Sequence, residues 1–314
     1  MCPTVGRVKT SLPSDEWADL LGAVDGVEVV VDDLSGPQDH HRDVVVVVPP
    51  YLRPWDVGLL AGMPRLRLVQ LLSAGYDGIL ERVPHGVLLA NAAGVHDDST
   101  AELALALVLA QLRGIPDFVR AQDRAEWMRP GILPSLADRR VLLLGYGSIG
   151  HAIARRLLPF GVELTVVASR AREGDELVAV VHGVDALPTL LPRHDVVIAI
   201  VPLTDSTRGH VDDGFLAAMP DGALFVNVAR GPVAVTDALV RHGGRLRIAV
   251  DVTDPEPLPA DHPLWHTPGV LVSPHVGGAT TAFAPRAVAM LRDQLARVAR
   301  GEEPRHVIHR PSDH

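Results

Sequence analysis

The sequence predicts an α/β protein with two doubly wound parallel sheets. Short runs rich in Val, Ile and Leu recur along the chain, and a helical stretch separates each run from the next. The runs are almost continuously apolar, as is typical of parallel strands buried on both faces. Because the 314 residues are about twice the length of a typical domain of ~150 residues, we expect two domains.

The apolar runs fall into two blocks on either side of a long helix expected over 103–112. Ser99 and Glu102 precede this helix with the spacing of a capping box, in which each side chain satisfies an amide of the other residue. A final helix is expected over 287–299, and one further strand near 5–8. The remaining strands are expected at 27–31, 44–48, 66–71, 87–90, 141–144, 163–167, 196–200, 224–228, 247–250 and 270–272.

This order of elements makes the chain cross between domains twice, near residue 100 and near residue 280. We expect a first domain over 1–100 and a second over 101–281. Residues 282–314 then hold a C-terminal helix that returns to the first domain.

Composition excludes several classes of protein. Hydrophobic residues make up 47% of the chain and charged residues 21%, which is unlike a disordered chain. The net charge of −9 argues against a nucleic-acid partner. No apolar run approaches the ~20 residues of a membrane helix, and the N-terminus lacks a signal-peptide pattern. We therefore expect a cytoplasmic protein with no membrane partner.

The cysteines and histidines do not indicate a metal site. Cys2 is the only cysteine, so an internal disulfide and a thiolate metal cluster are excluded. No His-x-x-x-His pair lies on an expected helix, and the adjacent His40 and His41 are expected to be a solvated pair in a polar loop. We expect no bound metal.

Three glycines follow the first expected strand of the second domain. Gly145, Gly147 and Gly150 form a G-x-G-x-x-G motif between an apolar strand and an amphipathic helix. The first glycine permits a tight turn, the second lets backbone approach a pyrophosphate, and the third lets helix and strand pack closely. The helix N-terminus adds amides and a positive dipole end. In this context the motif predicts a dinucleotide site, and the alternative is a structural turn.

The end of the next strand indicates which dinucleotide is bound. An NAD site places a carboxylate there, ~20 residues past the glycines, to accept hydrogen bonds from the ribose hydroxyls. Here the strand ends in Ala168, Ser169, Arg170, Ala171 and Arg172, with no carboxylate. A hydroxyl and two guanidinium groups suit a 2′-phosphate. We expect NADP(H) to be preferred; the alternative is two solvated arginines and use of NAD(H).

Three polar residues follow apolar strands of the second domain. Arg230, Glu256 and His275 come after the strands 224–228, 247–250 and 270–272. Ligands of doubly wound sheets bind at the carboxyl ends of the strands, so these side chains are expected to converge there. Histidine can deliver a proton near neutral pH, a neighbouring carboxylate stabilises the imidazolium, and arginine binds a substrate carboxylate. Together they suit reduction of a 2-keto acid by hydride transfer.

The motifs, in this order and spacing, resemble the D-isomer-specific 2-hydroxyacid dehydrogenase family. The resemblance covers roughly 66–285 and implies a flavodoxin-like substrate domain and a Rossmann dinucleotide-binding domain. The residues that carry it lie in 73–77, 91–102, 145–150, 202–209, 227–231, 251–257 and 274–278. Two departures are Ala168, where NAD-preferring members carry Asp, and Thr253, where many members have Phe.

The resemblance implies a role for each matching residue. His275 would be the general acid/base, Glu256 its partner, Arg230 the ligand of substrate carboxylate and carbonyl, and Asp251 a neighbour of the nicotinamide carboxamide. The implied cofactor contacts are Gly145, Tyr146, Gly147, Ser148, Ile149, Gly150, Ser169, Arg170, Arg172, Val201, Pro202, Thr207, Val228, Ala229, Arg230, Asp251, His275 and Gly277. The implied substrate contacts are Tyr51, Leu52, Ser73, Ala74 and Gly75. Homodimers are usual in the family, and by analogy the helix after Glu102 would contact the partner.

The substrate is expected to be a small 2-keto or 2-hydroxy acid of the D series. Tyr51, Leu52, Tyr76 and Trp265 are candidates for the side-chain pocket and could equally pack in the core. No basic cluster lies near Ser73 or Tyr51 to bind a substrate phosphate, so glyoxylate, hydroxypyruvate or a modestly apolar 2-keto acid ranks above phosphoglycerate. The alternatives are a formate- or phosphite-type dehydrogenase of the same fold and a nucleotide-sensing corepressor.

Overall fold

The computed structural model describes residues 7–308, which form two compact α/β units. The first unit comprises Met1–His96 and Thr281–His314, and the second comprises Asp97–Thr280. Cys2 and the start of the strand expected near 5–8 lie outside the described residues; the first observed strand is β1 (Val8–Leu12). No helix among residues 7–308 is long and apolar enough to cross a membrane.

The first unit is built on a six-stranded sheet in the order β14-β5-β4-β3-β1-β2. All neighbours are parallel except β14, which runs antiparallel to β5. Val46 and Val47 are both fully buried and pack into different clusters on the two faces of the sheet. The strands after β1 are β2 (Val27–Val31), β3 (Val46–Val47), β4 (Leu68–Gln70), β5 (Leu88–Ala90) and β14 (Val307–Ile308).

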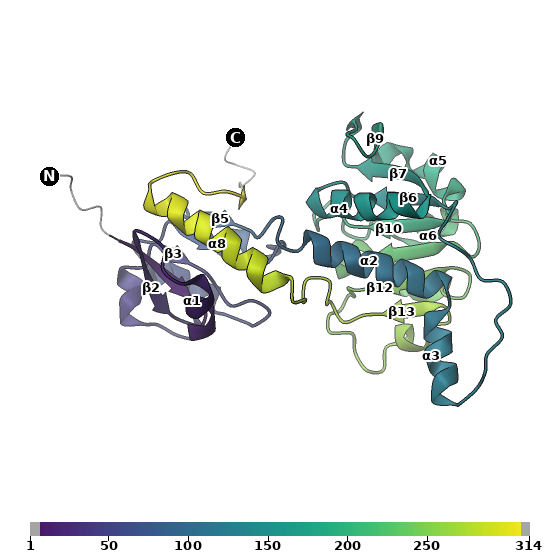
Figure 1. Cartoon of the computed structure of the whole chain (residues 1–314), viewed down its shortest axis with the longest axis horizontal. Helices are drawn as coiled ribbons and strands as arrows, with labels where there is room; N and C mark the ends of the chain where they lie inside the picture. The colour runs from purple at the N-terminus through teal and green to yellow at the C-terminus, as the bar shows by residue number, and fades with distance from the viewer. Residues whose placement is uncertain (1–6, 309–314) are drawn as a thin grey trace. The chain divides into compact units, whose positions relative to one another are not determined.

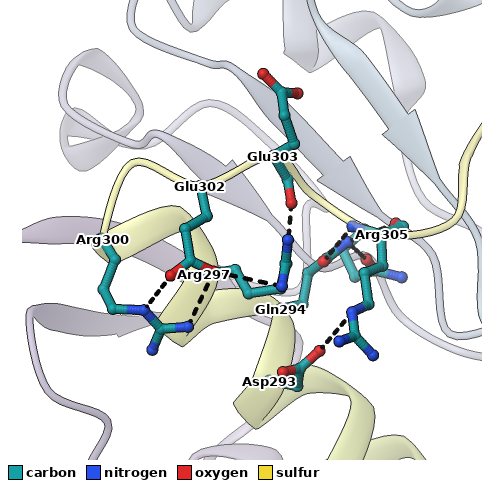
Figure 2. A network of polar contacts seen from close by, with 8 residues as sticks. Asp293, Gln294, Arg297, Arg300, Glu302, Glu303 and Arg305 are labelled. Carbon is teal, nitrogen blue, oxygen red and sulfur yellow. Dashed lines mark hydrogen bonds and ion pairs between the residues drawn. The ribbon is translucent and has the colours of Figure 1, made fainter.

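Helix α8 (Phe283–Ala299) belongs to this first unit, where it packs beside α1 (Asp15–Leu21) and β2 (Figure 1). A polar network then fixes the chain beyond α8 (Figure 2). The Gln294 side chain accepts a hydrogen bond from the Arg305 amide and donates one to its carbonyl. Arg297 donates to the Glu303 carbonyl. These bonds hold 303–305 against the helix and bring β14 to the sheet edge.

The second unit is built on an eight-stranded sheet in the order β13-β12-β11-β10-β6-β7-β9-β8. Only the edge strand β8 is antiparallel to its neighbour. Leu142 and Leu143 are fully buried on opposite faces, which explains the continuous apolar run. The strands are β6 (Arg140–Leu144), β7 (Glu163–Ala168), β8 (Arg172–Glu173), β9 (Val180–Gly183), β10 (Val196–Ala199), β11 (Leu224–Asn227), β12 (Arg247–Val250) and β13 (Val270–Val272).

Helices cover the sheet of the second unit. Helix α2 (Asp97–Leu112) lies beside α4 (Ser148–Leu157) and contacts β11 and β12 (Figure 1). The other α-helices of this unit are α3 (Ile115–Asp123), α5 (Leu187–Leu190), α6 (Asp213–Ala218) and α7 (Thr236–His242). Short 3₁₀ turns, η1 to η8, lie at 39–42, 57–62, 80–82, 158–160, 184–186, 191–193, 231–233 and 263–266.

The predicted capping box before α2 is wrong. The helix begins at Asp97, so Ser99 lies inside its first turn rather than ahead of it. The Ser99 hydroxyl instead hydrogen-bonds the Thr280 hydroxyl at 2.7 Å. Because Asp97 and Asp98 fill the first turn, their carboxylates already complement the positive end of the helix dipole.

The prediction of a solvated His40–His41 pair is also wrong. His41 is buried, and both imidazole Nε2 atoms contact the buried carboxylate of Asp32. His41 Nδ1 accepts a hydrogen bond from the Gln38 amide, which leaves the proton on Nε2 to be donated to Asp32. Burial by itself raises the pKa of Asp32, but the Leu34 amide and the two imidazoles outweigh it and hold that pKa below its ordinary value. Asp32, His40 and His41 therefore form a hydrogen-bonded cluster.

Candidate active site

The strand order places a switch point between β6 and β10. From β6 the chain continues to β7 and β9 on one side, and it then returns to add β10, β11, β12 and β13 on the other. Loops after β6 and β10 consequently diverge at the carboxyl edge, where ligands of doubly wound sheets bind. The glycine motif follows β6, and the three polar candidates follow β11, β12 and β13.

The glycine loop has the geometry of a phosphate cradle. Gly145 has φ 110°, and a Cβ there would lie 2.4 Å from the Ile200 carbonyl oxygen. A Cβ at Gly150 would lie 2.4 Å from the Gly145 oxygen, so two of the glycines are required by packing. Gly147 is different: its φ is −91°, and its Cβ would meet open space. Since no atom of residues 7–308 would meet a Cβ at 147, the open position fits the close approach of a ligand to the N-terminus of α4.

The loop after β7 reaches back to the glycine loop. Arg172 donates a hydrogen bond to the Tyr146 carbonyl at 3.0 Å, and its guanidinium lies 5.9 Å from the Tyr146 ring centroid. The Tyr146 hydroxyl donates to Asp175 at 2.9 Å. Burial and this hydrogen bond raise the pKa of Tyr146 well above its ordinary value, so the hydroxyl stays a donor. Ser169 and Arg170 are exposed, and no side-chain partner holds them among residues 7–308.

The remaining predicted cofactor residues of this edge lie in or near the same loops. The Thr207 hydroxyl donates to the Pro202 carbonyl at 2.6 Å and closes the turn after β10. The Ser148 hydroxyl donates to Asp97 at 3.2 Å. Val228 is buried, and Ile149 and Val201 are partly buried against the two clusters that flank the sheet.

Arg230 lies between the end of β11 and the short 3₁₀ turn at 231–233. The Asn227 side chain holds this turn because it accepts from the Ala229 amide and donates to the Arg230 carbonyl, both at 3.0 Å. The Arg230 guanidinium donates to the Ala229 carbonyl at 2.7 Å. At Gly231 a Cβ would lie 1.8 Å from the Thr253 carbonyl oxygen, so the turn packs directly against the chain that follows β12.

Asp251 organises the loop that carries His275. Its buried carboxylate accepts hydrogen bonds from the Ser273 hydroxyl at 2.6 Å and from the Val276 and Gly277 amides at 2.9 Å. The Asp251 carbonyl accepts from the His275 amide at 2.7 Å. The implied contact between Asp251 and the carboxamide stays a prediction, whereas its hydrogen bonds to the 273–277 loop are observed and were not predicted from the sequence.

His275 and Glu256 form a hydrogen-bonded pair. His275 Nδ1 lies 2.6 Å from Glu256 Oε1, and both side chains are about half exposed. His275 has φ 53°, a strained value for a residue with a β-carbon that is held here by the Asp251 contacts. With Nδ1 engaged, Nε2 is the nitrogen left for proton exchange, because no other described residue contacts it. The pair can therefore act as a proton donor whose charged form is stabilised by a carboxylate.

In the first unit, the loop after β4 presents unpaired amides. Four successive carbonyls, of residues 72–75, accept hydrogen bonds. In order, the donors are His96 Nε2, the Ala92 amide, Asn91 Nδ2 and the Ser73 hydroxyl. The amides of Ala74 and Gly75 donate to no acceptor within the described part of the chain. With the carbonyls already hydrogen-bonded, these amides are the groups of the loop left to bind an anionic oxygen.

Of the candidate pocket residues, Tyr51 and Tyr76 pack against the core of the first unit, whereas Leu52 and Trp265 are exposed. Tyr51 is half-buried and stacks on the rings of His96 and Phe283, so it belongs at least partly to the core. Leu52 is exposed and has φ 58°. Trp265 is exposed and donates from its indole nitrogen to the Pro259 carbonyl, and Tyr76 packs against the core cluster of the first unit. Thr253 is buried and donates from its hydroxyl to the Pro255 carbonyl.

Comparison with known proteins identifies the family. Residues 105–277 match the model of the D-isomer specific 2-hydroxyacid dehydrogenase, NAD binding domain. Glyoxylate reductase of Thermofilum pendens is 31% identical over 265 residues, which are 81% of this chain and 78% of that protein.

Solved structures agree. The D-isomer specific 2-hydroxyacid dehydrogenase from Xanthobacter autotrophicus Py2, in complex with NADPH and MES, has a TM-score of 0.81 and 30% identity, covering 97% of this chain and 98% of that one. The NADPH-dependent glyoxylate/hydroxypyruvate reductase SmGhrB from Sinorhizobium meliloti, in complex with NADP and malonate, has a TM-score of 0.77 and 27% identity, covering 96% and 97%.

Two parallel-sheet units, the second with a glycine loop at its switch point, define a nicotinamide-dependent oxidoreductase. The chain belongs to the D-isomer specific 2-hydroxyacid dehydrogenase family.

Proposed function

We propose that the protein is an NADP(H)-dependent reductase of small 2-keto acids, with glyoxylate or hydroxypyruvate as its substrate. The observation that carries the proposal is the His275–Glu256 pair at 2.6 Å, placed with Arg230 after neighbouring strands. The names of the relatives favour these two substrates. Reduction of both acids by NADPH, measured with the purified chain, tests the proposal.

Each residue of the site has a role in this reaction. Arg230 binds the substrate carboxylate and stabilises negative charge at the carbonyl oxygen. His275 Nε2 delivers a proton to that oxygen, and Glu256 stabilises the imidazolium. The amides of Ala74 and Gly75, in the first unit, are proposed as further donors to the substrate carboxylate. The N-terminus of α4 beside Gly147 would hold the pyrophosphate of NADP(H), which when bound would supply the hydride.

Arg170 is proposed as the ligand of the NADP 2′-phosphate, with Ser169 beside it. Arg172 already donates to the Tyr146 carbonyl, whereas Arg170 is exposed and held by no described residue. Replacing Arg170 by Ser is expected to lower the ratio of kcat/KM for NADPH over NADH by about tenfold or more, because a bidentate guanidinium–phosphate contact is lost.

The matched control for this prediction is Arg193→Ser, another exposed arginine of the same unit. It is expected to leave the NADPH/NADH ratio unchanged. A wild-type protein that uses NADH as efficiently as NADPH would contradict the proposed preference.

We also propose that the chain forms a homodimer. Large apolar side chains are exposed on α3 and on the segment that follows it, an arrangement that marks interaction surfaces in other proteins. They are Ile115, Val119, Trp127, Met128 and Ile132. This surface lies after α2, whereas most of the apolar length of α2 is buried within its own unit.

Replacing Trp127, which is 90% exposed, by Glu is expected to convert a dimer into a monomer in sedimentation analysis, because a charge would be buried in the interface. Phe160→Glu changes an exposed aromatic residue elsewhere on the same unit and is expected to leave the dimer intact. A monomeric wild-type protein would refute the proposal.

A further inference from the structure

His96 is a buried histidine at the end of the first unit, where the chain crosses to the second. Its ring stacks on Phe283, with centroids 5.2 Å apart and planes at 14°, and on Tyr51, at 5.5 Å and 24°. Tyr51 and Phe283 also contact each other at 4.3 Å. The three rings fix the position and the plane of the imidazole.

The two ring nitrogens of His96 have different surroundings. Nε2 lies 2.8 Å from the Leu72 carbonyl oxygen, and because a carbonyl only accepts, Nε2 carries the proton. Nδ1 is buried and has no hydrogen-bond partner among the described residues. A buried, unpaired nitrogen destabilises the fold, and a phenyl ring would stack as well without it. Stacking therefore does not explain a histidine here, whereas the Nε2 donor does.

The Leu72 carbonyl is the first of the four hydrogen-bonded carbonyls of residues 72–75. The next residues offer the unpaired amides of Ala74 and Gly75. The Leu72 carbonyl shares a rigid peptide plane with the Ser73 amide, so the bond from His96 fixes the first peptide of this loop. The next two planes carry the Ala74 and Gly75 amides and are held at their carbonyls by the Ala92 amide and the Asn91 side chain. His96 thus holds the start of the segment that binds the substrate carboxylate under the proposed function.

We propose that His96 is a positioning residue for substrate binding: its Nε2–H holds the Leu72 carbonyl and so anchors the start of the loop whose Ala74 and Gly75 amides bind the carboxylate. The proposal rests on the proposed function of the chain. It assigns the donor and the aromatic stack separate tasks, since the donor orients the loop and the stack stabilises the unit. Two substitutions separate these tasks.

His96→Phe keeps the stack and removes the donor. We expect KM for glyoxylate to rise by between about 10-fold and 100-fold, the inhibition constant of oxalate to rise in parallel, and the melting temperature to stay near that of the wild type. His96→Gln keeps a donor at the position of Nε2 and removes the stack. We expect KM within about threefold of the wild type, because the hydrogen bond to the Leu72 carbonyl is retained. The melting temperature is expected to fall, because the aromatic stack is lost.

The matched control is His194→Phe, a histidine that is equally buried in the second unit and hydrogen-bonded to Leu190 and Thr165. It is expected to lower the melting temperature without changing KM. The NADPH dissociation constant, measured by fluorescence, is expected to stay unchanged in both His96 variants.

Two results would overturn the assignment. In one, His96→Phe keeps the wild-type KM. In the other, both His96 variants lose stability and raise KM together, which marks a purely structural role. If the wild type binds NADPH and reduces no 2-keto acid, the proposed function fails, and the role of His96 fails with it.

Discussion

Replacing His275 by Ala is expected to lower kcat for NADPH-dependent reduction of glyoxylate by about 10²- to 10⁴-fold, the usual contribution of a general acid. The variant leaves the oxygen of the reduced carbonyl without its proton donor. The Asp251 carboxylate still holds the loop through the Val276 and Gly277 amides, so we expect the fold and NADPH binding to survive. Steady-state kinetics together with NADPH titration measure both effects.

Glu256→Gln probes the other half of the pair. The amide can still bond to His275 Nδ1 but carries no charge to stabilise the imidazolium, so kcat falls by less than in His275→Ala. His266→Ala, an exposed histidine of the same unit, is the matched control and should retain full activity. Wild-type kcat in His275→Ala would assign the proton transfer to another group.

Replacing Arg230 by Lys is expected to lower kcat/KM by roughly 10²- to 10³-fold, as when a transition-state hydrogen-bond donor is removed. Lysine keeps the charge and loses the planar fork that contacts two oxygens at once. The loss should appear in both kcat and KM, because Arg230 binds the carboxylate and also stabilises the developing negative charge.

Arg241→Lys, which alters an exposed ion pair with Asp213, is the control for the size of an ordinary arginine substitution. Guanidinium ion added to Arg230→Ala should restore part of the lost activity. Unchanged kcat/KM in Arg230→Lys would show that charge alone suffices and would remove the bidentate contact from the mechanism.

Where burial on both faces decides the structure, the sequence predicts it well. The expected strands 196–200, 224–228 and 247–250 agree with the buried strands β10, β11 and β12 to within one residue. The short edge strand β8 and its neighbour β9 were missed, since Arg172 and Glu173 are exposed and Val180–Gly183 is only partly buried. β14 was missed because Arg305 and its neighbours are placed by hydrogen bonds to α8, and an apolar pattern does not encode those.

The candidate site shows the same division. Arg230, Glu256 and His275 were predicted to lie at one edge of the sheet because they follow neighbouring parallel strands, and the structure pairs His275 with Glu256. Hydrogen bonds from side chains to backbone groups far away in the sequence were not predicted. The Asp251 contacts span 25 and 26 residues, and His96 reaches the Leu72 carbonyl across 24 residues. No local spacing predicts such bonds, because they depend on how loops from separate strands meet.

The most direct test of the account is the oxidation of NADPH by the purified wild-type protein, with glyoxylate, hydroxypyruvate, pyruvate, phenylpyruvate and 2-ketoisocaproate offered in turn and NADH as the alternative cofactor. We predict rapid oxidation of NADPH with glyoxylate or hydroxypyruvate, slower oxidation of NADH, and loss of both reactions in His275→Ala. Intact NADPH binding without reduction of any acid would contradict the account. It would direct attention to phosphite oxidation or nucleotide sensing on the same fold.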